Sequence, residues 1–251
     1  MQSADRILTR LARCLDGLAY AWLATLILLV CPPLARTPFG DLSNAVLLPL
    51  IGVALASLAI PLPVGASPRA ADTLGRIKVS AVLTLGLAPF VSWWLRADEN
   101  LYLLLMAVVA CYAVIWYLLE LSSFLFELTR DDGPVQLRLE IRLAHSALFY
   151  LGLVPVLAVH VSFLIALVMV RGTVLSDLSR TWMIVPWPAR YGMLLPVIYL
   201  ITLLWRLSGV LASRGAAAGA ETRSAALAGP SASDAGAGRA GEDAKMTKEN
   251  P

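Results

Sequence analysis

Charged residues are scarce in this chain. Asp, Glu, Lys and Arg together make up 15% of its 251 residues, whereas soluble globular domains carry about a quarter. Apolar residues fill the difference and reach 59%. The formal net charge of only +3 leaves no strongly basic surface of the kind that binds nucleic acid. The composition therefore excludes an ordinary soluble domain and gives no support to a nucleic-acid partner.

Cysteine and histidine are also rare. The cysteines Cys14, Cys31 and Cys111 lack the spacing of a metal site or of a disulfide framework. The two histidines, His145 and His160, lie fifteen residues apart, which is about 22 Å along one continuous helix and too far to share a metal ion. We therefore predict that the protein uses no metal and no cofactor.

Common catalytic signatures are missing as well. The sequence contains no HExxH, GxSxG, P-loop, CxxC or dinucleotide-binding motif. A serine could be paired with either histidine inside a helical bundle, but such pairings arise by chance when serines are many. The sequence thus favours a non-enzymatic role.

What the chain does have is a series of long apolar stretches. Several reach roughly 18 residues or more, the length that a helix needs to cross about 30 Å of hydrocarbon. A backbone in lipid must satisfy its own hydrogen bonds, and the stretches lack strand-like alternation, so they indicate helices. We predict an all-α, polytopic integral membrane protein, a bundle of about six transmembrane helices with a disordered C-terminal tail. The predicted spans are 17–34, 44–64, 77–95, 101–128, 143–170 and 191–207.

The two ends of the chain have their own character. Residues 1–16 place three arginines on one face of a helix, which indicates a basic interfacial segment or simply a positive flank. No small-residue cleavage site follows the first span, so we expect it to be a retained anchor. Residues 208–251 are rich in Ala, Gly and Ser without periodicity. They cannot bury enough apolar surface to offset the entropy of ordering, and we predict a disordered tail.

The basic residues predict how the chain is threaded. With alternate loops on opposite sides, fifteen Lys and Arg residues fall on the side of the termini and five on the other side. The positive-inside rule then predicts a multi-pass protein of the cell (inner) membrane with both termini in the cytoplasm. The loop 171–190 is the exception, because its three arginines would favour the opposite side.

Small residues recur at four-residue steps in two of the predicted spans. Such stripes let helices approach closely in lipid, where packing replaces the hydrophobic drive. Besides the lipid bilayer itself, we therefore expect either self-association or other membrane subunits as partners. The two stripes are Ser80, Thr84, Ala88 and Ser92, and Ala158, Ser162 and Ala166.

Glu120 is the carboxylate that lies deepest inside an apolar span. Ser123 and Glu127 follow at i+3 and i+7 and form a polar stripe with it. A carboxylate in the membrane costs about 2.5–3.5 kcal/mol on insertion scales, which makes it a candidate site. It is either held by a structural ion pair or exposed to a transport path. The segment that follows returns three candidate partners to the same end, Arg138, Arg142 and His145.

Residues 135–143 have two possible structures. Their apolar–polar alternation is typical of a strand, and Asp132-Gly133 is a hairpin dipeptide. A lone hairpin would need a partner sheet that the rest of the chain does not offer. We therefore predict a short interfacial helix before the fifth span.

Three functions fit the sequence. We favour an accessory or structural subunit of a membrane assembly, which should show a dry core and an apolar groove with small residues facing outward. The alternative is a small transporter, which should show a polar cavity reaching the membrane centre beside Glu120. The third is an intramembrane enzyme, which should place His145 or His160 near an acid or hydroxyl that faces a pocket.

Overall fold

The computed structural model is helical throughout the residues it describes. These are 2–30, 47–62, 66–94, 100–130, 133–158, 160–161 and 194–227. Five helical segments are long and apolar enough to cross a membrane, namely Arg6–Leu28, Pro68–Val91, Tyr102–Thr129, Val135–Ala158 and Leu195–Ala217. The prediction of an all-α, multi-pass membrane protein is confirmed. The helices are α1 (Gln2–Val30), α3 (Leu47–Ala59), α4 (Pro68–Trp94), α5 (Leu101–Thr129), α6 (Val135–Ala147) with the π-helix η2 (Leu148–Leu153), and α10 (Leu195–Leu227).

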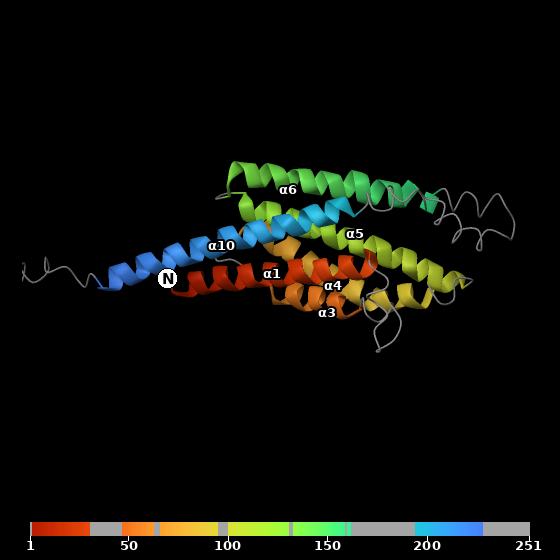
Figure 1. Ribbon diagram of the computed structural model, residues 1–251, viewed down its shortest axis with the longest axis horizontal. Helices are drawn as coiled ribbons and strands as arrows, with labels where there is room; N and C mark the ends of the chain where they lie inside the picture. The colour runs from red at the N-terminus through yellow and green to blue at the C-terminus, as the bar shows by residue number, and fades with distance from the viewer. Residues whose placement is uncertain are drawn as a thin grey trace, which may run out of the picture.

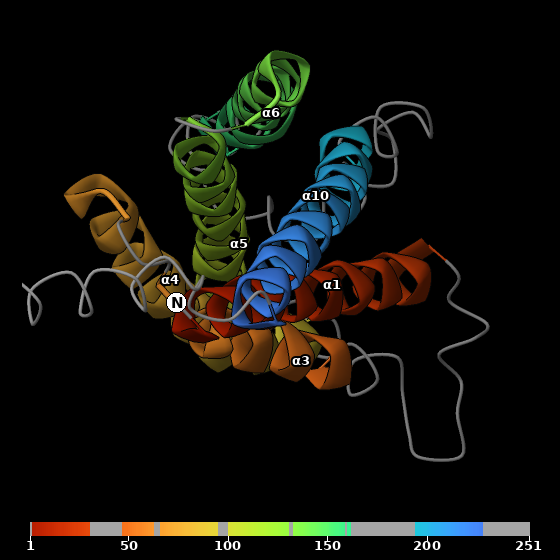
Figure 2. The ribbon, with the colours of Figure 1, turned by 90° about the vertical axis from the view of Figure 1, so that its left-hand side faces the viewer.

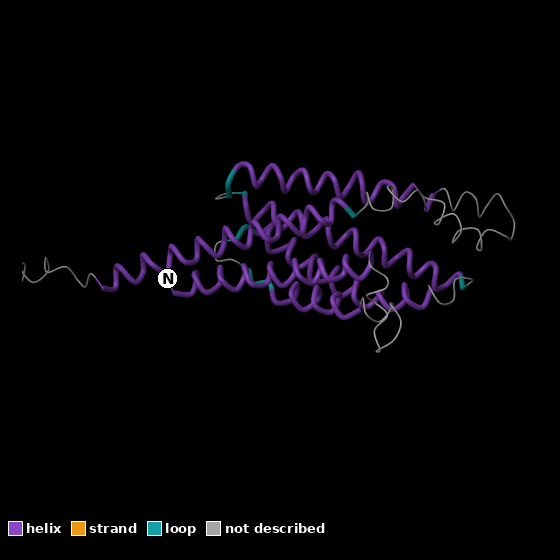
Figure 3. Tube along the Cα trace, viewed as in Figure 1, coloured by secondary structure: helices purple, strands orange, loops and turns teal. Residues whose placement is uncertain are grey.

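The helices form an elongated bundle with alternating directions. In Figure 1 the start of α1 and the end of α10 lie at the same end of the long axis, as do the start of α4 and the end of α5. α1 packs against α10 and α3, α3 against α4, and α4 against α5. α6 packs against α5 and α10, and the end-on view in Figure 2 places it at the outer edge of the bundle. The tube in Figure 3 is helix and short turns wherever the structure is described.

The core is built from regular apolar stripes. On α1 the fully buried residues Leu11, Leu15 and Leu18 follow one another at steps of four and three, the spacing of one helix face. Tyr117 of α5 is also fully buried, and its hydroxyl lies 2.8 Å from the Ser57 hydroxyl of α3. This bond satisfies two polar groups that lipid could not. The buried stripe begins inside the predicted interfacial segment, so α1 is one continuous helix without a boundary at residue 16.

α3 is shorter than the second span predicted at 44–64. Its 13 residues cover about 20 Å at 1.5 Å per residue, less than the hydrocarbon thickness of about 30 Å. Pro61 follows directly, and a proline has no N–H with which to continue the helical ladder. The described residues therefore hold five full-length spans and one shorter apolar helix rather than six equal spans.

α10 corrects the boundary predicted for the C-terminal tail. The helix does not end at Leu207 but continues to Leu227. Ser208 and Leu211, two of the first residues beyond the predicted end, are buried. The prediction of an irregular chain is thus wrong for residues 208–227, because alanine has the highest helix propensity and a helix can extend without an apolar face. Residues 228–251 lie outside the described part.

The segment after α5 is a helix, as predicted, and not a hairpin strand. α6 begins at Val135 and continues without interruption into the span that was expected to start at residue 143. Its inward face consists of Leu137, Ile141, Ala144 and Leu148. Leu139 and Leu143 are apolar but exposed, as expected of side chains that face lipid, and they produced the misleading alternation in the sequence. In η2 the Val154 N–H bonds the Phe149 carbonyl, five residues back.

Candidate functional site

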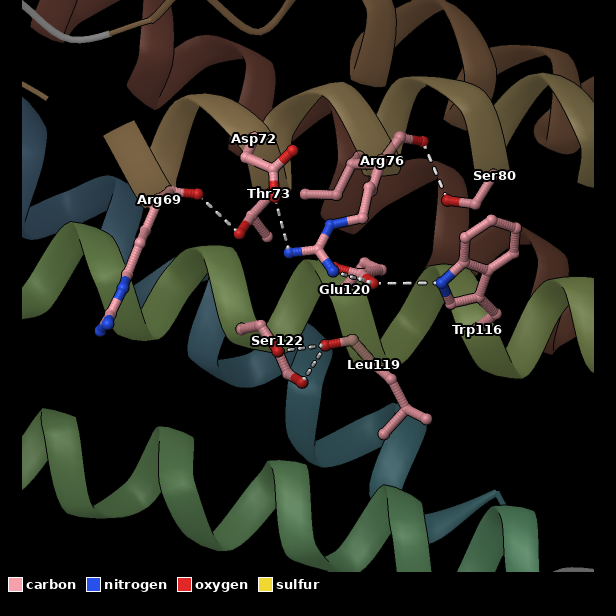
Figure 4. Close-up of polar contacts among 11 residues, drawn as sticks. Arg69, Asp72, Thr73, Arg76, Ser80, Trp116, Leu119, Glu120 and Ser122 are labelled. Carbon is pink, nitrogen blue, oxygen red and sulfur yellow. Dashed lines mark hydrogen bonds and ion pairs between the residues drawn. The ribbon is translucent and has the colours of Figure 1, made fainter. Parts of the chain in front are cut away.

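Glu120 is held between α4 and α5. Its Oε1 accepts a hydrogen bond of 3.1 Å from Trp116 Nε1 and lies 3.5 Å from Arg76 Nη1. Arg76 also lies 3.2 Å from Asp72, four residues earlier on α4. Figure 4 shows the Arg76 guanidinium extending from α4 between these two carboxylates. The carboxylate is thus part of an interhelical ion pair that ties α4 to α5.

The ion-pair partner differs from the predicted ones. We expected Arg138, Arg142 or His145 to approach Glu120 or Glu127, because the chain returns there after α5. The structure instead gives Glu120 a partner on α4, which packs along α5 on the side of Glu120. The other members of the predicted stripe point elsewhere, since Glu127 pairs with Arg130 at 3.5 Å and Ser123 donates to the Leu119 carbonyl.

A polar pocket of about 540 Å³ lies near this ion pair, between α4, α5 and α6. It is near the end of the bundle where α4 begins and α5 ends. Four of the six predicted site residues line it, whereas Glu120 and Arg138 do not. The polar pocket is lined by Arg69, Asp72, Thr73 and Arg76 of α4, by Ser122, Ser123, Phe126 and Glu127 of α5, and by Ile141, Arg142 and His145 of α6.

The pocket has more positive than negative charge. Asp72 is paired with Arg76, and Glu127 is paired with Arg130. Within the described part of the chain, no carboxylate lies within 4.0 Å of Arg69 or Arg142. The Arg142 guanidinium instead lies over the Phe126 ring, 5.2 Å from its centroid, a cation–π contact that holds its orientation. Among the described residues, these two guanidinium groups therefore face the pocket without an ion-pair partner.

His145 contacts a hydroxyl, but the arrangement does not resemble an activated nucleophile. Its Nδ1 lies 2.8 Å from Ser122 Oγ, which also lies 2.8 Å from the Leu119 carbonyl. A carbonyl can only accept, so the single Ser122 proton goes there and His145 donates to the hydroxyl. The Ser122 side chain is also fully buried. The contact fixes the imidazole rather than preparing the serine for attack.

A second cavity, the apolar groove, lies further along α5. Its volume is about 390 Å³. Tyr112 lines its wall, and the Tyr112 hydroxyl lies 3.0 Å from His160 Nδ1. The two histidines therefore lie at different cavities, His145 at the polar pocket and His160 beside the groove. No three metal-ligating side chains gather anywhere in the described ranges. The groove is lined by Leu83 of α4, by Val109, Tyr112, Ala113, Ile115, Trp116 and Leu119 of α5, and by Leu153 of η2.

The structure describes only part of the two small-residue stripes. Ser80 and Thr84 are buried inside the bundle, and Ala88 is half-buried. Ser80 and Thr84 thus serve packing within the chain rather than an outward face, and the Ser92 side chain lies outside the described part. Of the second stripe, Ala158 is exposed, while Ser162 and Ala166 lie outside the described residues.

The residues that α4 contributes to the pocket were not predicted from the sequence. Arg69 and Arg76 were counted as loop charges that set topology, and Asp72 and Thr73 were not considered. Yet Arg69, Thr73 and Arg76 follow at steps of four and three, which is one face of a helix. Helical spacing among charges just before an apolar stretch was the signal that could have identified them.

No family model, curated protein or solved structure matches this chain. The functional proposal therefore rests on the charges and the geometry of the polar pocket.

Proposed function

We propose that this multi-pass membrane protein binds an anionic group in the polar pocket and acts by binding, as an accessory or structural subunit of a membrane assembly. The observation that carries the proposal is the pair Arg69 and Arg142, which face one cavity and have no carboxylate partner among the described residues. A guanidinium presents a planar set of donors that matches carboxylate and phosphate oxygens. A bound anion would supply the negative charge that no described carboxylate places beside these two guanidinium groups.

The position of the pocket fits this proposal. Its lining helices begin or end on the side of the bundle that also holds the start of α1 and the end of α10, although α1 and α10 extend further along the long axis (Figure 1). The sequence assigns fifteen of its twenty Lys and Arg residues to that side, so we propose that this end faces the cytoplasm, with the protein in the cell membrane. Anionic groups are attracted to such a basic end, and the attraction falls off within about 10 Å at 0.1 M salt.

A transporter is the second candidate, and the cavities favour binding over it. Among the residues that the structure describes, the polar pocket does not continue as a polar path beyond Glu120. On the far side of Trp116 the wall is the apolar groove, with a single tyrosine hydroxyl that is already bonded to His160. An ion or polar solute would lose its hydration there without compensation.

An intramembrane enzyme is the third candidate. His145 does lie within hydrogen-bond reach of a hydroxyl, as that function requires. However, the Ser122 hydroxyl is fully buried and its proton is engaged by the Leu119 carbonyl. The geometry therefore supports a positioned imidazole in a binding pocket better than a catalytic pair.

Thermal unfolding of the full-length protein in detergent tests anion binding. Titration with inorganic phosphate, compared with chloride at equal ionic strength, should raise the melting temperature, since a ligand at about 100 times its Kd stabilises by about 2.7 kcal/mol. Arg142→Gln and Arg69→Gln should each remove most of that response. Lys78→Gln is the matched control, because Lys78 is on α4 but outside the pocket wall.

A phosphate response that is the same in wild type, Arg69→Gln and Arg142→Gln would contradict the proposal. So would a response no larger than that of chloride. Identification of chains that co-purify in mild detergent would then address the accessory role itself.

A further inference from the structure

The polar pocket and the apolar groove share the same helix faces. On α5 the wall residues Tyr112, Trp116, Leu119, Ser123 and Phe126 follow at steps of four, three, four and three, which keeps them on one face. Leu119 belongs to the groove and Ser123 to the pocket, so the two cavities adjoin within about one turn, or 6 Å.

α4 shows the same continuity. Arg69, Arg76 and Leu83 follow at seven-residue steps, again one helix face, and pass from the polar pocket into the groove. On the third wall, Ile141 and His145 line the pocket while Leu153 of η2 lines the groove. All three walls therefore run from one cavity into the next.

The chemistry changes sharply along this path. One end presents the guanidinium groups of Arg69 and Arg142, which have no ion-pair partner within the described ranges. The other end presents aliphatic and aromatic side chains, and its two polar atoms are already engaged: Trp116 Nε1 bonds Glu120 and the Tyr112 hydroxyl bonds His160. A ligand that fills both cavities is anionic at one end and apolar at the other.

The length of the groove matches one half of a bilayer. Val109 and Leu119 are ten residues apart, which is about 15 Å along the helix. Half of the hydrocarbon thickness of about 30 Å is also about 15 Å. Val109 and Leu83 on the groove wall are 46% and 40% exposed, so the groove opens to the surroundings of the bundle.

We infer that the anionic group is the headgroup of a lipid, bound by Arg69 and Arg142, with one acyl chain lying in the apolar groove. This inference rests on the proposed anion binding and specifies its ligand class. Basic pockets between transmembrane helices hold anionic headgroups in this way. The lipid keeps its ordinary orientation, because the polar pocket lies toward the end of the bundle and the groove extends inward from it.

The test compares lipids and soluble anions on the full-length protein. In nanodiscs of phosphatidylcholine with increasing phosphatidylglycerol, the melting temperature should rise with the anionic lipid. Glycerol phosphate and inorganic phosphate, which carry the headgroup chemistry without chains, should bind at least about tenfold more weakly, because they forgo burial of the chain.

Two variants separate the two ends of the site. Arg142→Gln should weaken phosphatidylglycerol binding about tenfold or more, as expected for loss of a charge-assisted hydrogen bond. Val109→Trp fills the groove from an exposed wall position and should weaken lipid binding while leaving the phosphate response unchanged. Val82→Trp, at an exposed position outside both cavity walls, is the matched control and should bind lipid like wild type.

The outcomes distinguish lipid binding from the anion binding on which it rests. If soluble phosphate binds as tightly as phosphatidylglycerol, or if Val109→Trp binds the lipid normally, the lipid inference is overturned while anion binding stands. If Arg142→Gln retains full phosphatidylglycerol binding, the lipid is only a general annular contact, and the inference is also overturned. If neither phosphate nor phosphatidylglycerol stabilises the wild type, both proposals fail.

Discussion

At Glu120 two donors converge on one carboxylate oxygen. The Trp116 N–H approaches from the preceding turn of α5 and the Arg76 guanidinium from α4. The Glu120 side chain is 13% exposed, whereas that of Arg76 is 51% exposed and also contacts Asp72. The carboxylate therefore depends on its donors more than Arg76 depends on the carboxylate.

This asymmetry predicts the effect of two substitutions at Glu120. Glu120→Gln keeps an oxygen that accepts from Trp116 and loses only a partly screened ion pair, while Glu120→Leu also leaves the Trp116 N–H without its acceptor. We expect Glu120→Leu to lose about 1 kcal/mol more stability than Glu120→Gln, the typical net value of one hydrogen bond. Thermal unfolding of both variants in detergent measures the difference. Two variants as stable as the wild type would show that Glu120 has no structural role.

The sequence predicted that Glu120 needs a pairing partner, but it did not predict which residue supplies that partner. A lone carboxylate in an apolar span must be paired, and that could be reasoned from Glu120 alone. Which helix supplies the cation depends on which helices are neighbours. Proximity along the chain favoured Arg138, Arg142 and His145, whereas packing of α4 along α5 selected Arg76.

Among the elements, α10 departs furthest from expectation. Ser208, directly beyond the predicted end of the span, donates a hydrogen bond to Asp16 of α1, and Leu211 is buried one turn later. The part of α10 just beyond the predicted end of the span thus takes part in the packing of α10 against α1.

Two truncations test the role of α10 beyond residue 207. Ending the chain after Leu207 removes the bond to Asp16 and should destabilise the protein by about 1.5–3 kcal/mol, the usual value of a hydrogen bond to a charged group. Ending it after Leu227 removes only residues outside the described part and should leave unfolding unchanged. Ser208→Ala in the full chain isolates the single bond. Equal melting temperatures for the two truncations would refute the role assigned to residues 208–227.

Some elements were predictable because local signals mark their ends. α5 begins after Asn100, whose side chain accepts from the Tyr102 and Leu103 N–H groups, and it ends within one residue of the prediction. α4 begins at Pro68, nine residues before its predicted start, because its first turns are polar on the side that lines the pocket. Hydropathy alone cannot separate such a polar helix face from a loop.

For the whole molecule, the alternating directions of the helices bring the beginning of the first helix and the end of the last described helix to one side. The start of α1 and the end of α10 lie at the same end of the bundle (Figure 1). The charge count of fifteen against five gives that end its predicted cytoplasmic assignment.

Reporter fusions test this arrangement in cells. Fusions after positions 70, 133 and 215 should report the cytoplasm, and fusions after positions 40, 98 and 180 should report the opposite side. The physical reason is the cost of moving arginine-rich flanks across the membrane. Reporters after 133 and 215 on opposite sides would contradict the even number of crossings between them. A cytoplasmic reporter at 180 would place the loop 171–190 on the side that its three arginines favour.

The π-turn of η2 makes one stretch of the chain tolerant of a change in length. The inward face of α6 advances by four, three and four residues to Leu148, and the next wall residue, Leu153, comes five later. Deleting one residue between them would restore the ordinary step of four and keep both walls in phase. The same deletion earlier in α6 would rotate the helix by about 100° and turn Ile141 and His145 away from the pocket. η2 thus contains one residue more than the α-helical spacing requires. The position of this extra residue determines whether the residues that line the pocket and those that line the groove lie on the same face of the helix.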